Sequence, residues 1–516
     1  MTVTVTVQGL EDSTGALTGV AQRLVDHDAT LWGLEAESEA AVRLGWLDVV
    51  DVARGFLPEL LALGDALRAE GVDTVVLCGM GGSSLAPEVI CKVAGVPLTV
   101  LDSTHPDQVR AALSGELSRT VVVVSSKSGG TVETDSQRRV LVEAMTAQGI
   151  DAASRVVVVT DPGSPFEQLA TDEGYRATFL ADARVGGRYS ALTAFGLVPS
   201  ALAGADVESL LSSAEQLLPT LAADDSPALR LGAVLGGSGR DKVCLDASGS
   251  DLPGFGDWAE QLIAESTGKL GKGLLPVVVD ASSPELTDPA PDVHVVRLGT
   301  EVPPVGTAVS GALGEQLLAW EFAVAVAGKV LGIDPFDQPD VESAKQATRG
   351  LLDAQPEPEP PVFVDGGVEV HGTTGLLDGV SDLAGAVDAL LSTLEPRGYL
   401  AVMAYLDRLR DGALAEVRDP LARRTSRPVT FGWGPRFLHS TGQYHKGGPP
   451  IGSYLQVTGL VIQDLAIPDR PFTFGTLIAA QAAGDAKVLA DKGRPVLRLN
   501  VTSATGLAQV TQVLSR

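Results

Sequence analysis

The chain has 516 residues, so at roughly 150 residues per domain it should hold about three domains and bury large cores. There are 38 Lys and Arg against 65 Asp and Glu, which gives a formal net charge of −27. An acidic surface of that size repels polyanions, which argues against nucleic acid and anionic membranes as partners. Any anionic ligand must therefore meet a local basic pocket.

The cysteines and the N-terminus bear on the compartment. Cys78, Cys91 and Cys244 lie in or beside apolar runs without paired spacing, as expected for buried thiols in a reducing compartment. Residues 1–7 alternate like a strand and lack the basic start and apolar core of a signal peptide, and no apolar run approaches the length of a membrane span. We therefore expect a cytoplasmic, soluble protein without a disulfide framework or a cysteine metal site.

Short β-branched runs alternate with helical stretches in the first part of the chain. They cover residues 75–77, 98–101, 121–124 and 156–159. Because each run ends in Gly, Asp, Ser or Thr, this rhythm predicts βαβ units and a buried parallel sheet. A second set predicts another α/β domain. Its strands are expected at 242–245, 274–279 and 294–296, and its amphipathic helices at 202–221 and 313–331.

A run of proline and glutamate at residues 355–361 cannot form a helix and favours extended polyproline geometry, so it is the best candidate for a linker. Beyond it, helical patterns are expected over 376–394 and 399–409, before a glycine-rich segment at 441–452. The predicted division is a helical segment with a first α/β domain over 1–196, a second over 197–352, the linker over 353–361, and a C-terminal α/β domain over 362–516.

The first predicted strand runs into a glycine-rich turn that contains Gly81, Gly82 and Ser83. Glycines let the backbone approach an anion, and the following helix start offers unpaired N–H groups, so the turn has the outline of a phosphate or nucleotide loop. It fits neither the dinucleotide fingerprint nor the P-loop. A tight strand-to-helix turn explains the segment equally well.

The third predicted strand ends in a segment with hydroxyls at Ser126, Ser128 and Thr131, two glycines and the ammonium of Lys127. Placed where a helix begins, these groups form a cradle for a phosphomonoester. Helix capping is the alternative, but a cap needs one hydroxyl rather than three. Since both loops follow strands of one parallel sheet, we expect them to face the same crevice.

Two charged residues are candidates for the chemistry itself. Arg188 follows two glycines, where a guanidinium could reach into a cleft and stabilise an oxyanion, although a surface arginine is the commoner explanation. Glu265 lies on a predicted helix that Gly268 stops, and helical spacing places it on one face with Gln261 and Leu262. A desolvated carboxylate there would be a good proton-abstracting base.

The last motif runs from Gly332 to Lys345 and predicts a turn followed by a helix start with acidic residues in its first turn. Lys345 by itself is explained as a solvated helix lysine.

In their order along the chain, the five motifs resemble the phosphoglucose isomerase family, which is built from two sugar-isomerase (SIS) domains. The resemblance spans about residues 70–350 and is strongest to the isomerase half of fused transaldolase–isomerase chains.

This resemblance implies an α/β fold with two SIS-type doubly wound parallel-sheet domains plus a C-terminal α/β domain. It also implies a homodimer that isomerises glucose 6-phosphate and fructose 6-phosphate in glycolysis and gluconeogenesis through a cis-enediolate. The residues matching the family's substrate-binding motifs are Gly81, Gly82, Ser83, Ser126, Lys127, Ser128, Thr131 and Gln338. By the same resemblance, Glu265 is the base, Arg188 stabilises the enediolate, and Lys345 assists ring opening.

The chain departs from the family at one point. Many members carry Gly-Gln-His between the glutamate and lysine motifs, where this sequence has only His294 in a strand-like run. The nearest similar segment, Thr441 to Gly448, has one residue inserted before its histidine. We therefore expect His445 to reach the site from the third domain or a second subunit, although an incidental histidine in a glycine-rich loop explains the segment nearly as well.

Three other functions are compatible with parts of the pattern. Mannose 6-phosphate could also be accepted, and a SIS module could bind phosphosugars as a regulator without turnover. Such a sensor would not require Glu265, Arg188 and Lys345. A phosphosugar aminating enzyme would need an N-terminal glutaminase, and Met1 is followed by Thr2 with no cysteine near it. No residue pattern suggests a metal or an organic cofactor, and a small phosphosugar is the expected partner.

Overall fold

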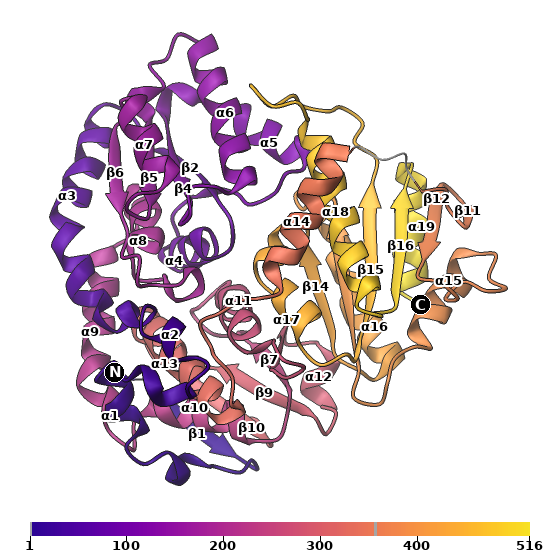
Figure 1. The fold of residues 1–516 in the computed structure, drawn as a ribbon, viewed down its shortest axis with the longest axis horizontal. Helices are drawn as coiled ribbons and strands as arrows, with labels where there is room; N and C mark the ends of the chain where they lie inside the picture. The colour runs from indigo at the N-terminus through magenta and orange to yellow at the C-terminus, as the bar shows by residue number, and fades with distance from the viewer. Residues whose placement is uncertain (1–2, 355–358) are drawn as a thin grey trace.

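A computed structural model describes residues 3–354 and 359–516, with the backbone alone for residues 341–345 and 353. Its strands form three sheets, each with helices packed against it (Figure 1). The first two units share one continuous hydrophobic core, because helices from both pack together between the sheets. The third unit has a core of its own, and it shares a further apolar cluster with the second unit. The fold is therefore α/β, as the sequence predicts, and the first two units are joined by packing as well as by the chain.

The first sheet is entirely parallel and has the strand order β3-β2-β4-β5-β6. Its strands are β2 (Thr74–Gly79), β3 (Thr99–Leu101), β4 (Thr120–Ser125), β5 (Val156–Thr160) and β6 (Ala177–Leu180). Every residue of β4 and β5 is buried, which explains their unbroken β-branched runs. The order reverses between β2 and β4, so their carboxyl ends form the crevice where ligands bind in such sheets.

Helices and short 3-10 turns surround this sheet. The helices are α3 (Val49–Ala69), α4 (Leu85–Ala94), α5 (Pro106–Leu113), α6 (Val132–Ala147), α7 (Pro165–Asp172) and α8 (Ala194–Leu202). The short helices α1 (Val20–Val25) and α2 (Glu37–Ala40), which precede them in the chain, lie beside the second unit (Figure 1). Two 3-10 turns lie at the crevice, η4 (Gly81–Ser83) and η7 (Gly187–Tyr189). The helix expected over 202–221 begins later than predicted, at Val207, because α8 ends at Leu202 and residues 203–206 are not helical.

The second sheet has the order β1-β10-β9-β7-β8. Its strands are β7 (Lys242–Asp246), β8 (Leu275–Val279), β9 (Val293–Leu298) and β10 (Gly306–Ser310), with β1 (Thr4–Gln8) antiparallel at the edge. Its helices are α9 (Val207–Leu221), α10 (Pro227–Gly237), α11 (Phe255–Thr267), α12 (Pro284–Thr287) and α13 (Leu313–Leu331), whereas the following helix α14 (Val341–Ala354) packs against α18 (Phe474–Asp491) of the third unit (Figure 1). The predicted N-terminal strand is thus confirmed, and it covers the open edge of β10 in the second sheet.

The third sheet has the order β11-β12-β16-β15-β13-β14. Its strands are β11 (Phe363–Asp365), β12 (Val368–Gly372), β13 (Tyr399–Tyr405), β14 (Val429–Trp433), β15 (Gly452–Gly459) and β16 (Val496–Val501). The helices are α15 (Leu383–Leu391), α16 (Arg418–Thr425), α17 (Gly442–Gly447), α18 (Phe474–Asp491) and α19 (Ala504–Leu514), with the 3-10 turn η9 (Arg436–His439). Of the predicted linker, residues 355–358 lie outside the described residues.

The predicted helix over 399–409 is wrong, because its first seven residues form strand β13. All seven are buried, since β13 is hydrogen-bonded to β14 on one side and β15 on the other, inside the sheet. A short apolar run does not distinguish a buried strand from a buried helix by its periodicity. The helix expected over 376–394 is also shorter than predicted and spans only Leu383–Leu391.

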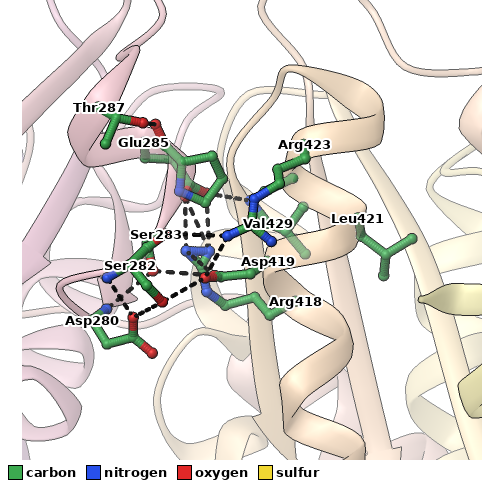
Figure 2. Close-up of polar contacts among 12 residues, drawn as sticks. Asp280, Ser282, Ser283, Glu285, Thr287, Arg418, Asp419, Leu421, Arg423 and Val429 are labelled. Carbon is green, nitrogen blue, oxygen red and sulfur yellow. Dashed lines mark hydrogen bonds and ion pairs between the residues drawn. The ribbon is translucent and has the colours of Figure 1, made fainter. Parts of the chain in front are cut away.

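A buried ion pair joins the second and third units (Figure 2). The guanidinium of Arg418, on α16, donates hydrogen bonds of 2.8 to 3.2 Å to both carboxylate oxygens of Glu285, on α12. Ser283 Oγ donates to Asp419 Oδ1 at 3.1 Å, and the Val429 N–H donates to the same carboxylate of Glu285 at 3.4 Å. The contact fixes the third unit against the second because every bond crosses between them.

The third unit also contacts the first. Phe474 and Leu477 of α18 share a small apolar cluster with Val109 and Val140 of the first unit. Arg436 of η9 is ion-paired with the carboxylates of Glu88 and Asp102 of the first unit. Burial lowers the pKa of Arg436, but these negative charges outweigh burial and hold the pKa above its ordinary value. Segments far apart in the sequence, α6 and α18, thus approach each other (Figure 1).

All three cysteines are buried and unpaired, as expected. Burial raises the pKa of Cys91 to about 12 and raises that of Cys78 and Cys244 as well. Within the described part of the chain, no helix is both long and apolar enough to cross a bilayer.

Candidate active site

The two predicted ligand loops leave the first sheet side by side. Gly79, at the end of β2, pairs in register with Ser125, at the end of β4. The turn η4 follows the first strand and the segment 126–131 follows the second. Ser83 and Ser126 are both buried at this edge. The expectation that both loops face one crevice therefore agrees with the strand order.

The glycines of η4 are needed for close packing. Gly81 has φ of +56°, and a Cβ there would lie 2.7 Å from Gln261 Nε2 and 2.9 Å from the carbonyl oxygen of His439. A Cβ on Gly82 would lie 1.9 Å from the carbonyl oxygen of Gly187. Only glycine lets this loop contact η7, α11 and η9 at once, so the loop joins all three units.

The second loop brings its hydroxyls together. Ser126 Oγ and Thr131 Oγ1 are hydrogen-bonded at 2.9 Å, and Thr131 precedes the first residue of α6. Ser128 Oγ accepts from the Gly130 N–H at 3.3 Å. Oriented N–H groups at the start of a helix and neighbouring hydroxyls suit a phosphate. The three predicted hydroxyls therefore lie together at the carboxyl end of β4.

Lys127 has a different partner from the one that its motif predicts. Its ammonium is paired with Asp161 and also donates to the carbonyl oxygen of Ala183 at 3.3 Å. Burial raises the pKa of Asp161 above its usual range, and the bond from Lys127 opposes that rise. The hydroxyls and backbone N–H groups, rather than this ammonium, thus line the cradle in this structure.

Arg188 is buried and anchored on several sides. Its Nε donates to Ser266 Oγ at 2.9 Å, and its Nη2 donates to the carbonyl oxygens of Pro335 and Asp337 at 2.6 and 2.9 Å. The side chain is 3% exposed. The alternative of a surface arginine is therefore excluded, and the guanidinium is rigidly oriented by η7, α11 and the turn after α13.

Glu265 lies beside this guanidinium. Its Oε2 is 3.7 Å from Arg188 Nη1, and its side chain is 7% exposed. It sits in the last turn of α11, which ends at Thr267 as predicted. Gln338 Oε1 lies 3.5 Å from the same Nη1. Three residues from separate motifs, Arg188, Glu265 and Gln338, are thus brought together.

The turn that carries Gln338 is held by Lys269. The buried ammonium of Lys269 donates to the carbonyl oxygens of Asp334 and Asp337 at 2.7 and 2.6 Å. It also donates to Asp337 Oδ1 at 2.5 Å. Burial and the nearby Arg188 charge lower the pKa of Lys269 to about 8. These long-range bonds of Lys269 are seen only in the fold.

Lys345 lies on α14, and its side chain is outside the described residues. The residue before that helix is nevertheless connected to the site by hydrogen bonds. The Asp340 N–H donates to Gln443 Oε1 at 3.0 Å, and Gln443 Nε2 donates to the carbonyl oxygen of Gly268 at 2.9 Å. Gln443, from the third unit, therefore bridges the end of α11 and the start of α14.

The structure places His445 in the core of the third unit, and this corrects the expectation that it reaches the site. Its ring stacks on Tyr399, with Nδ1 3.0 Å from the phenol oxygen, and the Tyr454 hydroxyl donates to its carbonyl oxygen at 3.0 Å. Burial lowers the pKa of His445 to about 3. A neutral imidazole satisfied by tyrosines belongs to the core, because this environment disfavours its charged form.

Another histidine, His439 in the turn η9 just before that segment, lies at the crevice instead. Its Nε2 is 3.2 Å from Glu133 Oε1, and Gln261 Nε2 donates to its carbonyl oxygen at 2.8 Å. Glu133 is in the first turn of α6, directly after the phosphate loop. The sequence analysis did not single out His439 or Glu133. The available signal was a second histidine six residues before His445.

Among the described residues, one group of side chains has the composition of a metal site. Donor atoms of His105, Asp107 and Asp407 lie within 4.8 Å of one another. Asp107, however, already binds Arg110 and Arg410. Two guanidiniums on one carboxylate make this group an ion-pair network between the first and third units.

Comparison with known proteins agrees with this architecture. The sequence profile described as Phosphoglucose isomerase matches residues 59–221. The probable glucose-6-phosphate isomerase of Haloarcula marismortui is 31% identical over 351 residues, which cover 54% of this chain and 78% of that protein. That of Natronomonas pharaonis is 30% identical over 356 residues, covering 56% of this chain and 82% of the relative.

Two solved structures share the fold. A glucose-6-phosphate isomerase from Chlamydia trachomatis superposes with a TM-score of 0.56 at 18% identity, covering 69% of this chain and 89% of that one. The hypothetical protein TT0462 from Thermus thermophilus superposes with a TM-score of 0.58 at 24% identity, covering 67% and 99%. The class defined by this fold and site is that of the sugar isomerases that interconvert aldoses and ketoses. Within it, the chain belongs to the phosphoglucose isomerase family.

Proposed function

We propose that this enzyme interconverts glucose 6-phosphate and fructose 6-phosphate. The observation that carries the proposal is the buried pair of Arg188 and Glu265, 3.7 Å apart, beside Gln338. A base next to a fixed cation is the arrangement that proton transfer at a carbon beside a carbonyl requires. The names of the relatives from Haloarcula marismortui and Natronomonas pharaonis support the choice of substrate.

The phosphate is assigned to the loop after β4. Ser126, Ser128 and Thr131 provide hydroxyls there, and the start of α6 provides N–H groups. Ser83 lies on the neighbouring loop. Binding energy from this non-reacting group positions C1 and C2 of the sugar against Glu265, which lowers the barrier to the chemical step.

The isomerisation itself requires one base. Glu265 removes the proton from C2 of the open-chain aldose, and the electron pair forms the C1–C2 double bond as the carbonyl oxygen becomes negatively charged. Arg188 stabilises the charge of the resulting cis-enediolate. Glu265 then returns the proton to C1, while the oxygen on C2 becomes the ketose carbonyl. The protons balance, because the hydroxyl proton of the oxygen on C2 is transferred to the oxygen on C1 in the same cycle.

Opening of the cyclic substrate is assigned to His439 in place of His445, with Lys345 as its partner. A carboxylate accepts hydrogen bonds and does not donate them, so Glu133 fixes the proton of a neutral His439 on Nε2. The opposite nitrogen, Nδ1, is then available to exchange a proton with the sugar. A histidine is suited to this step because its ordinary pKa lies near neutral pH.

The test measures conversion of fructose 6-phosphate to glucose 6-phosphate with a coupled dehydrogenase, for the natural chain and for Glu265→Gln. We expect turnover to fall by about a thousandfold or more, since no other base replaces the carboxylate, while phosphosugar binding survives. Binding without turnover in both proteins would instead favour a non-catalytic phosphosugar-binding regulator. Turnover that survives in Glu265→Gln would refute the assignment of the base.

A further inference from the structure

Glu133 receives two hydrogen bonds from the third unit at a single oxygen. Besides His439, Gln481 Nε2 lies 2.7 Å from Glu133 Oε1. Gln481 belongs to α18 and is 3% exposed, and Glu133 is 6% exposed. The carboxylate that contacts the histidine is therefore itself held by an amide from a different element.

The direction of these bonds follows from the chemistry of the groups. A carboxylate only accepts, so the NH₂ group of Gln481 faces Glu133 and its carbonyl oxygen faces away. That oxygen accepts a hydrogen bond of 2.6 Å from Thr104 Oγ1. Thr104 is fully buried in the segment between β3 and α5. If the amide were flipped, the Gln481 carbonyl oxygen would face the Glu133 carboxylate, and two acceptors would meet without a proton. Only one orientation of the amide therefore satisfies both Glu133 and Thr104.

The helix that carries Gln481 is firmly held. One turn further along α18, the fully buried Asp485 forms an ion pair of 2.6 Å with Lys446. One turn before, Leu477 packs in the apolar cluster that contains Val109 and Val140. A side chain on a rigid, packed helix can hold its partner within a narrow range of positions.

We propose that Gln481 is a positioning residue for ring opening: it fixes the Glu133 carboxylate so that this carboxylate holds His439 in one tautomer and one orientation. This inference rests on the proposed function. The hydrogen-bonded series Thr104, Gln481, Glu133 and His439 then connects the first and third units at the site. The third unit supplies the group that exchanges the proton and also the group that aligns it.

The test compares Gln481→Met with Gln456→Met. Methionine keeps much of the volume and removes both hydrogen bonds. Gln456 is a matched control, because it is a buried glutamine that donates to the Ala482 carbonyl oxygen of the same helix at 2.9 Å. Thermal unfolding verifies that both variants fold. Thr104→Val, which breaks only the far bond of the series, is a second variant with a smaller expected effect in the same direction.

Two substrates separate positioning from a general structural role. We expect Gln481→Met to slow turnover of cyclic fructose 6-phosphate about tenfold, the effect of about one hydrogen bond. Exchange of the C2 proton of a four-carbon aldose 4-phosphate, which cannot close a ring, should stay unchanged. Gln456→Met should alter neither rate. Equal slowing of both substrates, or no slowing of either, would overturn the inference.

A spectroscopic measurement does not depend on turnover. In a histidine-labelled sample, with His439 assigned through His439→Asn, we expect nitrogen NMR to show a single Nε2–H tautomer at pH 8. In Gln481→Met a second tautomer should appear, because the Glu133 carboxylate loses the hydrogen bond from α18 that fixes its orientation. An unchanged tautomer would overturn the inference even if the natural chain did not isomerise fructose 6-phosphate. Absence of turnover in the natural chain would contradict the proposed function alone.

Discussion

Arg188 and Glu265 face each other with 3.7 Å between Nη1 and Oε2, and neither side chain is more than 7% exposed. The guanidinium is held by Ser266 and by the carbonyl oxygens of Pro335 and Asp337. These bonds use the planar fork of donors that distinguishes arginine from lysine. The cation therefore has a fixed position relative to the base before any substrate binds.

Arg188→Lys should lower kcat about a hundredfold with a smaller change in KM, because a single ammonium cannot make the same set of bonds or stabilise both enediolate oxygens. Steady-state kinetics with fructose 6-phosphate measures both constants. The matched control is Arg54→Lys on the surface, where Arg54 binds Ser212 and Glu215. A kcat within a factor of two of the natural value in Arg188→Lys would contradict the role of Arg188.

The two histidines of the third unit should behave differently. His439→Asn should slow turnover of cyclic substrate about a hundredfold, because asparagine cannot exchange a proton at neutral pH. Proton exchange with the four-carbon aldose phosphate should persist. His445→Asn should instead lower the thermal stability, since the Tyr399 hydroxyl loses one of its two buried partners and the ring stacked on Tyr399 is removed. If His445→Asn were the variant with selectively slowed ring opening, the assignment to His439 would be wrong.

Gly82→Ala should disrupt the joint between η4 and η7. Its Cβ would lie 1.9 Å from the Gly187 carbonyl oxygen, so the backbone must move. We expect a loss of about 1 to 3 kcal/mol in the free energy of unfolding and a reduced kcat, because Arg188 follows Gly187 directly. Denaturant unfolding and kinetics measure both. Gly115→Ala, whose Cβ would meet only ordinary contacts, should leave both unchanged.

The ion pair between Glu285 and Arg418 should behave as a buried pair (Figure 2). Glu285→Met or Arg418→Met should each cost about 3 to 5 kcal/mol, because one buried charge loses its partner. The double variant Glu285→Met, Arg418→Met should recover most of that loss. Denaturant unfolding of the four proteins gives the coupling free energy. Arg423→Met, at a side chain that is 54% exposed, should cost less than about 1 kcal/mol. Additive effects in the double variant would contradict this account.

Glu260 should make the stability fall with rising pH. Burial and the Asp257 charge raise its pKa to about 8. The folded protein therefore keeps a proton that the unfolded chain releases, so this stability is complete below the unfolded pKa of about 4.5. As the pH rises to about 8, the free energy of unfolding falls by about 2 kcal/mol. This figure is reduced to allow for the partial exposure of the Glu260 side chain to solvent.

Denaturant unfolding at pH 5 and pH 8 measures the effect. Glu260→Gln should remove this part of the pH dependence, since a neutral amide still accepts the Ser440 hydroxyl at the position of Oε1. Glu59→Gln, at an exposed position, should keep the natural pH dependence. A steeper fall in Glu260→Gln would show that the sign is wrong.

Much of the fold was predictable because local patterns specify it. The buried β-branched runs of the first sheet predict strands without reference to distant contacts, and Gly268 predicts the end of α11. Strand β13 was mistaken for a helix, since its apolar run has no decisive period and its hydrogen-bonding neighbours, β14 and β15, come later in the chain.

For the site, the sequence by itself determined which functional groups are present: a hydroxyl-rich loop at Ser126, a carboxylate at Glu265 and a guanidinium at Arg188. Only the tertiary structure decided which groups meet. It turned Lys127 toward Asp161, buried His445 against Tyr399, and brought His439 and Gln481 to Glu133. The physical reason is that residue type and spacing specify local conformation, whereas contacts between distant segments depend on how three separately patterned units pack.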